Sequence, residues 1–423
     1  MLYLIIPIAL FIILGLPIAF SMGLGSFFYV WITDTSSLNI ILNKLINGIN
    51  SFSLLAVPLF IFMGEIIVRG GAMHRLMSLP NVLLKKFTGG LGYVNVGSAV
   101  LLGGISGSMV ADVAALSNVF GPEMKRKGFA PGFIASLQGS SGTLAAIIPP
   151  SIILILIGVS GGVSIGDLFL AGIIPGILTA IFLMIYVYFY AKKNNIIDQN
   201  KVTKGEFINA VKQSILPLGL PIVILGGILL GIFTATESAS IAVVYAFILS
   251  RYIYKELNWE NIKQALLSTV INTGSIMILI SSATAFAWLL SKAQATKKLL
   301  DTLMGISENP IIIFFCLILL LLILGTVIEG APVALIMTPL LMPIATDIGM
   351  DPVHFGVLMA LTISIGSNTP PMAISLLTAC KILNVDMEKT FPHILIFIGL
   401  MFVSLLIVAV VPELALFIPK LNG

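Results

Sequence analysis

Long runs of apolar residues, separated by short polar breaks, fill most of this 423-residue chain. The runs cover residues 1–31, 54–68, 92–120, 131–160, 168–190, 217–250, 264–290, 311–342, 353–382 and 392–418. About 20 apolar residues suffice for a helix to span a bilayer, and several of these runs are far longer. Each long run is interrupted by Gly, Pro or Ser, so the pattern predicts a polytopic all-α membrane protein with broken helices.

The interruptions occur twice along the chain at a constant spacing. Subtracting 221 from second-half positions places Gly325 on Gly104 and Pro370-Pro371 on Pro149-Pro150. Related halves with interrupted segments in corresponding positions are typical of secondary transporters, whose binding site lies where the broken helices meet. We therefore predict three divisions of the chain: a first repeat over 1–190, a cytoplasmic linker over 191–216 and a second repeat over 217–423.

The distribution of basic residues predicts that the two repeats are inverted. Lys and Arg cluster in residues 69–90, 121–130 and 191–214, and such clusters stay on the cytoplasmic side of a membrane. The apolar run between the first two clusters cannot cross the membrane, so we expect a re-entrant hairpin there. The counterpart of 121–130 in the second half is 343–352, which has two Asp and no basic residue. It is therefore expected on the opposite face.

The predicted architecture has two re-entrant hairpins, 92–120 and 311–342, and two discontinuous helices, 131–160 and 353–382. It gives ten crossings only if 1–31 and 217–250 each form a pair of short helices. The polar connections 70–90 and 291–309 occupy matching places and are expected to form amphipathic surface helices. The second of these connections has three lysines on the predicted outer side. This placement disagrees with the tendency of basic residues to stay on the cytoplasmic side.

Composition agrees with a membrane protein and excludes other functions. Apolar residues make up 58% of the chain and charged residues 9%, whereas an average soluble domain carries about 25% charged residues. A soluble enzyme is therefore excluded. The net charge of +4 is too small to favour nucleic-acid binding, and we recognise no catalytic triad, phosphate loop or clustered metal ligands. We expect transport across the bilayer, without enzymatic activity.

The four predicted breaks, at 104–108, 142–151, 325–332 and 366–372, supply backbone groups that a continuous helix would use internally. Unwound carbonyls and hydroxyls suit a hard cation such as Na⁺, while free N–H groups at helix N-termini suit an anion. No Arg or Lys lies inside these breaks, so we expect no buried guanidinium of this chain to hold the anion. The polar side chains expected to serve instead are Ser106, Ser108, Thr143, Ser151, Asn368 and Thr369.

Carboxylates inside apolar runs are costly and are therefore functional candidates. Asp112 follows the first hairpin tip by one turn and Glu329 lies in the second tip, so both are predicted to belong to the substrate site. Glu65 and Glu237 are interpreted as residues at helix ends near the headgroups. The predicted substrate-binding set is Ser106, Ser108, Asp112, Thr143, Ser151, Glu329 and Asn368.

Five motifs make the chain resemble the large membrane subunit of the tripartite ATP-independent periplasmic (TRAP) transporters, of the DctM or SiaM type. They are 104–112 (GISGSMVAD), 141–151 (SGTLAAIIPPS), 339–343 (PLLMP), 351–356 (DPVHFG) and 366–371 (GSNTPP). The resemblance covers essentially the whole chain. It implies an elevator-type carrier in a bacterial inner membrane, driven by a Na⁺ gradient. It also implies two partners: a small four-helix membrane subunit of the DctQ or SiaQ type and a periplasmic substrate-binding protein.

The resemblance further implies two or more sodium ions, each bound beside one hairpin tip. One site would use Ser106 with carbonyls around Ala145, Ile148 and Pro150. The other would use Gly325, Gly366, Thr369 and Met372. Family members carry sialic acids, C4-dicarboxylates and other carboxylates. A self-sufficient Na⁺/carboxylate symporter remains the alternative, and an ion channel would differ from both in carrying current without saturable uptake.

Overall fold

The computed structural model describes residues 2–34, 36–196 and 202–421, and within these ranges all regular secondary structure is helical, without a strand. Seven helical segments are long and apolar enough to cross a membrane: Phe52–Arg69, Ile165–Lys193, Lys204–Leu229, Trp259–Lys292, Pro310–Val327, Gly330–Asp347 and Met387–Val410. Six further apolar helices have 10–17 residues. The chain is therefore a polytopic all-α protein, as the apolar pattern predicts.

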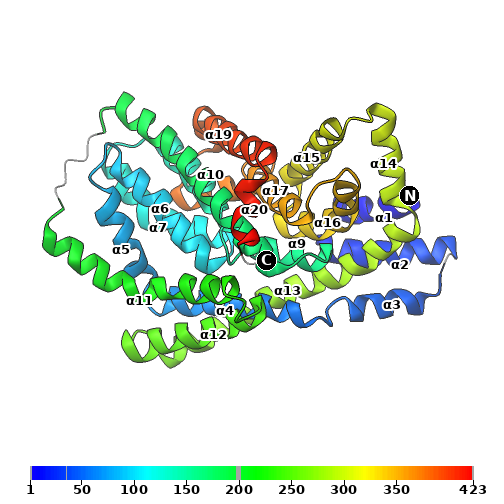
Figure 1. The fold of residues 1–423 in the computed structure, drawn as a ribbon, viewed down its shortest axis with the longest axis horizontal. Coiled ribbons are helices and arrows are strands. Elements are labelled where there is room, and N and C mark those ends of the chain that lie inside the picture. The colour runs from blue at the N-terminus through cyan, green and yellow to red at the C-terminus, as the bar shows by residue number, and fades with distance from the viewer. Residues whose placement is uncertain (1, 35, 197–201, 422–423) are drawn as a thin grey trace.

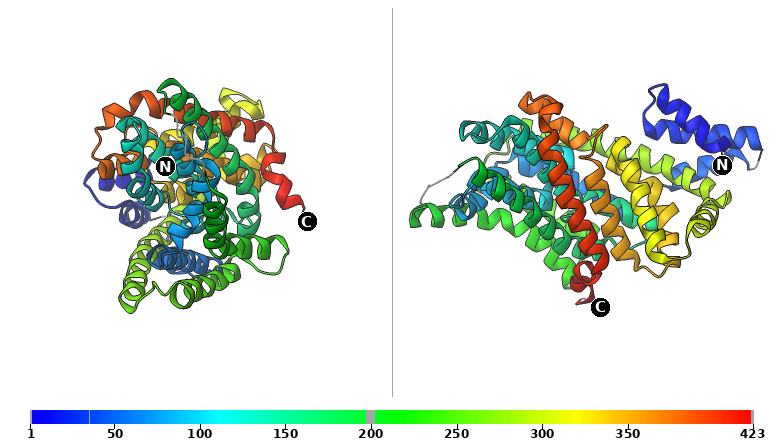
Figure 2. Two further views of the ribbon diagram at one scale, coloured as in Figure 1. Left: turned by 90° about the vertical axis from the view of Figure 1, so that its left-hand side faces the viewer. Right: turned by 90° about the horizontal axis from the view of Figure 1, so that it is seen from above.

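The helices pack into two groups, which we call the scaffold and the hairpin bundle. The scaffold contains α1 (Leu2–Ile13), α2 (Ile18–Thr33), α3 (Leu38–Asn47), η1 (Phe52–Leu55), α4 (Ala56–Arg69), α5 (Ala72–Leu84), α11 (Lys204–Leu229), α12 (Ala235–Ile248), η3 (Leu249–Ile253), α13 (Trp259–Lys292) and α14 (Ala295–Ile306). In Figure 1, α11, α12, α4, α13 and α3 run along the lower edge of the molecule. The pair α1 and α2 protrudes at one end, which Figure 2 shows from above.

The hairpin bundle lies over the scaffold in the same view (Figure 1). It contains α6 (Gly90–Ser106), α7 (Met109–Arg126), α8 (Pro131–Gly142), η2 (Thr143–Ala146), α9 (Ile152–Gly161), α10 (Ile165–Lys193), α15 (Pro310–Val327), α16 (Gly330–Asp347), α17 (Pro352–Gly366), α18 (Ile374–Leu383), η4 (Met387–Thr390), α19 (Phe391–Val410) and α20 (Glu413–Lys420). Helices α5 and α14 connect the two groups at opposite ends of the molecule.

The helix bounds repeat with the offset found in the sequence. Adding 221 to the bounds of α6 and α7 gives 311–327 and 330–347, which match α15 and α16 to within one residue. The same shift carries α8 onto α17 and α9 onto α18. The two halves differ at one place, because the stretch equivalent to the single helix α13 is divided in the first half into α3, η1 and α4.

Both predicted hairpins and both discontinuous helices are present. Each hairpin turns over two residues, between Ser106 and Met109 and between Val327 and Gly330. The broken helices are interrupted between α8 and α9 and between α17 and α18. Each interruption contains a Pro-Pro pair, and proline lacks the N–H that a continuous helix needs. The predicted pair of short helices in 1–31 is present as α1 and α2, divided near Gly15. The run 217–250 is divided near Gly231 as predicted, but α11 has 26 residues and begins before this run, so only α12 is short.

The connection between the repeats is shorter than the predicted linker over 191–216. Helix α10 continues to Lys193, and α11 already begins at Lys204. A capping box starts α11, in which Thr203 and Glu206 bond each other's backbone N–H. This motif satisfies free N–H groups of the first turn and explains the early helix start. Residues 197–201 of the predicted linker lie outside the described residues.

The second piece of each broken helix packs on the opposite repeat. Helix α9 lies against α16 of the second hairpin, and α18 lies against α7 and α8 of the first half. A hydrogen bond joins the two breaks, because the Ser364 hydroxyl donates to the Thr143 carbonyl at 3.2 Å. The hairpin bundle is therefore one interlocked unit made from both repeats.

The inversion itself stays a prediction, and labelling at two exposed positions tests it. Lys125 near the end of α7 and Asp347 at the end of α16 lie within one residue of corresponding places in the two repeats. In intact cells we expect an impermeant thiol reagent to label Asp347→Cys at once. Lys125→Cys should react only after permeabilisation, because its basic loop stays inside. Labelling of both positions from the same side would contradict the inversion.

Candidate functional site

A cavity of about 700 Å³ lies between the scaffold and the hairpin bundle. Its scaffold wall comes from α2, α4 and α13. Its other wall comes from the tips of both hairpins and from the start of α9. The cavity therefore lies at the tips of both hairpins, between residues of the two repeats.

Three helices begin at the wall of this cavity. Helix α7 starts after Ser108, α16 starts after Glu329, and α9 starts after Ser151. The Ser108 hydroxyl accepts the Ala111 N–H at 3.4 Å as the cap of α7. Free N–H groups and aligned peptide dipoles make helix N-termini favourable for anions. Three such ends at one cavity favour an anionic occupant.

Three residues of the predicted substrate-binding set line the cavity. Ser106 and Ser108 lie at the first hairpin tip, and Glu329 lies at the second. Asp112 is one turn further along α7, is only 2% exposed and is not among the lining residues. One of its carboxylate oxygens accepts the Ser106 hydroxyl, and the other has no hydrogen-bond partner among the described residues. The structure thus places Asp112 behind the tip, beside a predicted sodium ligand.

The other three residues of that set lie deeper in the hairpin bundle. Thr143, Ser151 and Asn368 are fully buried, and none of them lines the cavity. The hydroxyl of Thr143 donates to the Ser140 carbonyl at 2.8 Å, and that of Ser151 donates to the Ala146 carbonyl at 2.7 Å. Their predicted role in substrate binding stays a prediction. Thr143 and Ser151 satisfy backbone groups around the first break, whereas the Asn368 Oδ1 atom has no hydrogen-bond partner among the described residues.

The backbone of the first break packs directly on the first hairpin tip. A Cβ on Gly103 would lie 3.1 Å from the Cα of Ala145, and one on Gly107 would lie 2.8 Å from the Pro150 carbonyl oxygen. The carbonyls of Ile148 and Pro150 accept no hydrogen bond from any described residue. Ser106, Ala145, Ile148 and Pro150, the residues expected at one sodium site, are therefore in one neighbourhood.

The second break packs on the second hairpin tip in the same way. A Cβ on Gly366 would lie 2.8 Å from backbone atoms of Gly325, so the close approach requires glycine there. The Met372 N–H donates to the Thr326 carbonyl at 3.1 Å. The Thr369 hydroxyl donates to the Ile365 carbonyl at 2.7 Å, which leaves its lone pairs available. Gly325, Gly366, Thr369 and Met372 are thus also brought together.

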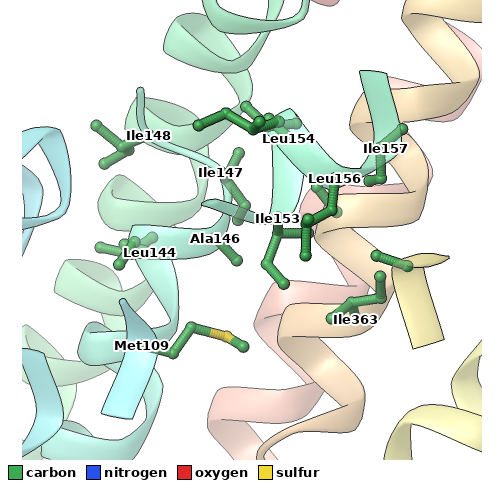
Figure 3. Packing of buried hydrophobic residues seen from close by; sticks show 14 of the residues in the cluster. Met109, Leu144, Ala146, Ile147, Ile148, Ile153, Leu154, Leu156, Ile157 and Ile363 are labelled. Atoms are coloured by element: carbon green, nitrogen blue, oxygen red, sulfur yellow. The ribbon is translucent and has the colours of Figure 1, made fainter. Parts of the chain in front are cut away.

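Apolar packing behind the cavity fixes the position of the second hairpin tip relative to the first. Gly330, the first residue of α16, lies against Ile363, Met109 and Ile153. Figure 3 shows these three side chains, from three different helices, around one space beside the first break. A Cβ on Gly330 would come within 2.8 Å of Ile363. The second tip therefore depends on side chains from both repeats for its position.

The scaffold wall contains polar residues that the sequence did not predict as site residues. Glu65 and Arg69 of α4, with Asn272 and Ser275 of α13, line the cavity. Glu65 lies near the end of α4, as its interpretation as a helix-end residue predicts, and it also lines the cavity. Arg69, which lies outside the four predicted breaks, lines the same cavity. The available signal was a Glu and an Arg four residues apart at the end of an apolar run, because this spacing puts both on one helix face.

Comparisons with known proteins agree over nearly the whole chain. Residues 5–414 match the family model described as the tripartite ATP-independent periplasmic transporter, DctM component. The chain is 38% identical over 405 residues to a putative TRAP transporter large permease protein of Haemophilus influenzae, covering 96% of this chain and 95% of that protein. It is 36% identical over 401 residues, 94% of each chain, to the 2,3-diketo-L-gulonate TRAP transporter large permease protein YiaN of Escherichia coli.

The fold also resembles that of a solved membrane protein. The structure of MtrF from Neisseria gonorrhoeae, whose title refers to a class of antimetabolite efflux pumps, superposes with a TM-score of 0.52. The match covers 88% of this chain and 85% of that one at 15% identity. At this identity the likeness shows a shared fold alone.

Proposed function

This chain belongs to the DctM component family of the tripartite ATP-independent periplasmic transporters and is a multi-pass permease, not an enzyme; from this premise we propose that it imports an organic acid anion with sodium. The proposed mechanism is an elevator movement, in which the hairpin bundle slides along the scaffold. One observation carries the proposal: the cavity has one wall in each group of helices.

The anionic substrate follows from the groups that face the cavity. The N-termini of α7, α9 and α16 supply N–H groups and positive dipole ends. Ser106 and Ser108 add hydroxyls, and Arg69 adds a positive charge. The 2,3-diketo-L-gulonate in the name of the Escherichia coli relative is such an organic acid. Sialic acids and C4-dicarboxylates belong to the same chemical class.

Sodium coupling is supported by the oxygen atoms at the two breaks. The unbonded carbonyls of Ile148 and Pro150 and the hydroxyl of Ser106 are neutral oxygen ligands, which hard cations prefer. Asp112 adds a buried carboxylate beside Ser106. An unpaired buried charge is costly, so we propose that a sodium ion near Ser106 balances it.

The partners follow from the tripartite nature of the family. We propose that the chain works in a bacterial inner membrane with a small four-helix membrane subunit and a periplasmic substrate-binding protein. The binding protein would select the acid, because the cavity offers N-termini and hydroxyls that fit many carboxylates.

Reconstitution tests the function directly. We expect vesicles containing this chain and its small subunit, supplied with the binding protein, to accumulate the acid when sodium is higher outside. Uptake should scale with the sodium gradient and should stop when the binding protein is left out. Uptake by this chain alone would favour the self-sufficient symporter. Full uptake driven by protons without sodium would contradict the coupling, and current without saturable uptake would indicate a channel.

A further inference from the structure

Arg69 and Glu65 form the centre of a polar cluster on the scaffold wall of the cavity. The Nε atom of Arg69 lies 2.9 Å from a Glu65 carboxylate oxygen. Its Nη1 atom donates to the Gln264 side chain at 2.8 Å. The second Glu65 oxygen accepts the Ser268 hydroxyl at 2.5 Å. Two helices, α4 and α13, thereby fix the guanidinium while its side chain stays 30% exposed.

The repeat gives this cluster no counterpart at the other end of the scaffold. The 221-residue offset places Phe286 at the position of Glu65 and Leu290 at that of Arg69. Both are buried apolar residues of α13. If an inverted repeat alternates between states related by its pseudo-two-fold axis, these two positions of the scaffold wall are charged in one state and apolar in the other.

The cluster also stays with the scaffold, while the hairpin tips belong to the bundle. Gly64 contacts the first tip, since a Cβ there would lie 3.5 Å from the Cα of Ser106. Arg69 lies five residues further along α4, where the helix meets the basic stretch 69–90. Gly64, Arg69 and the tip residues line the same cavity, so an anion at the tips would share the cavity with Arg69 in this arrangement and would be separated from it once the bundle slides away.

We propose that Arg69 is a state-specific contact for the substrate carboxylate, which stabilises the loaded carrier in the arrangement seen here; this rests on the function proposed above. A ligand shifts a conformational equilibrium only by binding one state better, and Arg69 is the fixed charge that makes the difference. Glu65 neutralises Arg69 when the cavity is empty and competes with the carboxylate when it is loaded. The two residues should thus act in opposite directions on substrate binding.

Two small thiol reagents of opposite charge test, without a substrate, whether Arg69 and Glu65 set the electrostatic potential in the cavity. Asn272→Cys supplies the target, because Asn272 lines the cavity and its side chain contacts Ser268. Both native cysteines are first replaced by Ala, and the complex with its small subunit is used. We expect Arg69→Gln to lower the ratio of sulfonatoethyl to trimethylammonioethyl methanethiosulfonate labelling rates about threefold. Glu65→Gln should raise this ratio.

Protection of the same cysteine tests substrate contact. With N-acetylneuraminate and succinate as probes, Arg69→Gln should raise the concentration for half-protection about tenfold, the loss of one charged hydrogen-bonded contact. Glu65→Gln should lower it. Arg251→Gln is the matched control, because Arg251 is a scaffold arginine bonded to the Leu257 carbonyl and does not line the cavity.

The outcomes separate this proposal from the function on which it rests. A structural ion pair predicts the same change for Arg69→Gln and Glu65→Gln, so shifts in one direction would overturn the proposal. An unchanged labelling ratio would overturn it whatever the substrate is. Sodium-driven uptake by the unmutated complex is measured in parallel, and its failure counts against the proposed function instead.

Discussion

Uptake by a Gly166→Cys/Ile228→Cys carrier is expected to stop on oxidation and to return on reduction. Gly166 lies in the first turn of α10 in the hairpin bundle, and Ile228 lies in the last turn of α11 in the scaffold. A Cβ on Gly166 would lie 3.1 Å from Cγ2 of Ile228. Because Cγ2 is bonded to Cβ, the two Cβ atoms would lie within about 4.6 Å of each other, close to the range of about 3.5–4.5 Å that disulfides span. The bond would fix the two groups in one arrangement. If transport requires the bundle to slide, a fixed carrier cannot complete its cycle.

A second cysteine pair controls for oxidation and for cross-linking as such. The Thr179 and Ser404 hydroxyls lie 2.8 Å apart, on α10 and α19 within the hairpin bundle. Oxidised Thr179→Cys/Ser404→Cys should keep its uptake, because the bond joins helices that move together. Both variants are made without the native cysteines, and gel mobility after protease cleavage between the pairs confirms the bond. Continued uptake by fully cross-linked Gly166→Cys/Ile228→Cys would rule out the sliding movement.

Asp112→Asn is expected to remove the response of the carrier to sodium. The change keeps the shape of the side chain and its bond to Ser106 but removes the buried negative charge. Sodium at 100 times its dissociation constant should stabilise the unmutated protein by about 2.7 kcal/mol. We expect most of this gain to be absent in the variant, and half-maximal uptake to need at least about tenfold more sodium, or about 1.4 kcal/mol.

Thermal unfolding with and without sodium measures the effect, with potassium at equal ionic strength as the reference. Asp167→Asn is the control, because this aspartate lies in the first turn of α10, away from both tips. In the absence of sodium, Asp112→Asn should unfold at a higher temperature than the unmutated protein, since no unpaired charge is buried. A sodium response in the variant equal to that of the unmutated protein would exclude Asp112 from the ion site.

The broken helices could be predicted because their signals are local. Pro149-Pro150 and Pro370-Pro371 interrupt long apolar runs, and the constant offset between them shows that the interruption is part of a repeat. Proline removes a backbone donor wherever it stands, so its effect can be predicted without knowing the neighbours. The hairpins were predictable for a related reason, since the charge pattern alone forbids a crossing between two basic loops.

The scaffold wall could not be predicted because it depends on packing between distant segments. Glu65 and Arg69 belong to an apolar run that looks like an ordinary helix end, and only the approach of α13 brings Gln264 and Ser268 to them. The burial of Asn368 has the same origin. Its sequence neighbours indicate a break in the helix. Whether the side chain faces the cavity or the interior depends on how the helices of the hairpin bundle pack around it.

The interlocking of the two repeats has a consequence for synthesis of the protein. Helix α7 packs on α18, which leaves the ribosome about 250 residues later. At about 5–20 residues per second, roughly tens of seconds separate the two helices. During this time Ser136 of α8 lacks the Thr390 carbonyl to which it bonds in the finished fold. The first half therefore cannot complete its packing before the second half is synthesised. Until then, we expect the membrane-insertion machinery to cover the unpaired polar groups of the first half.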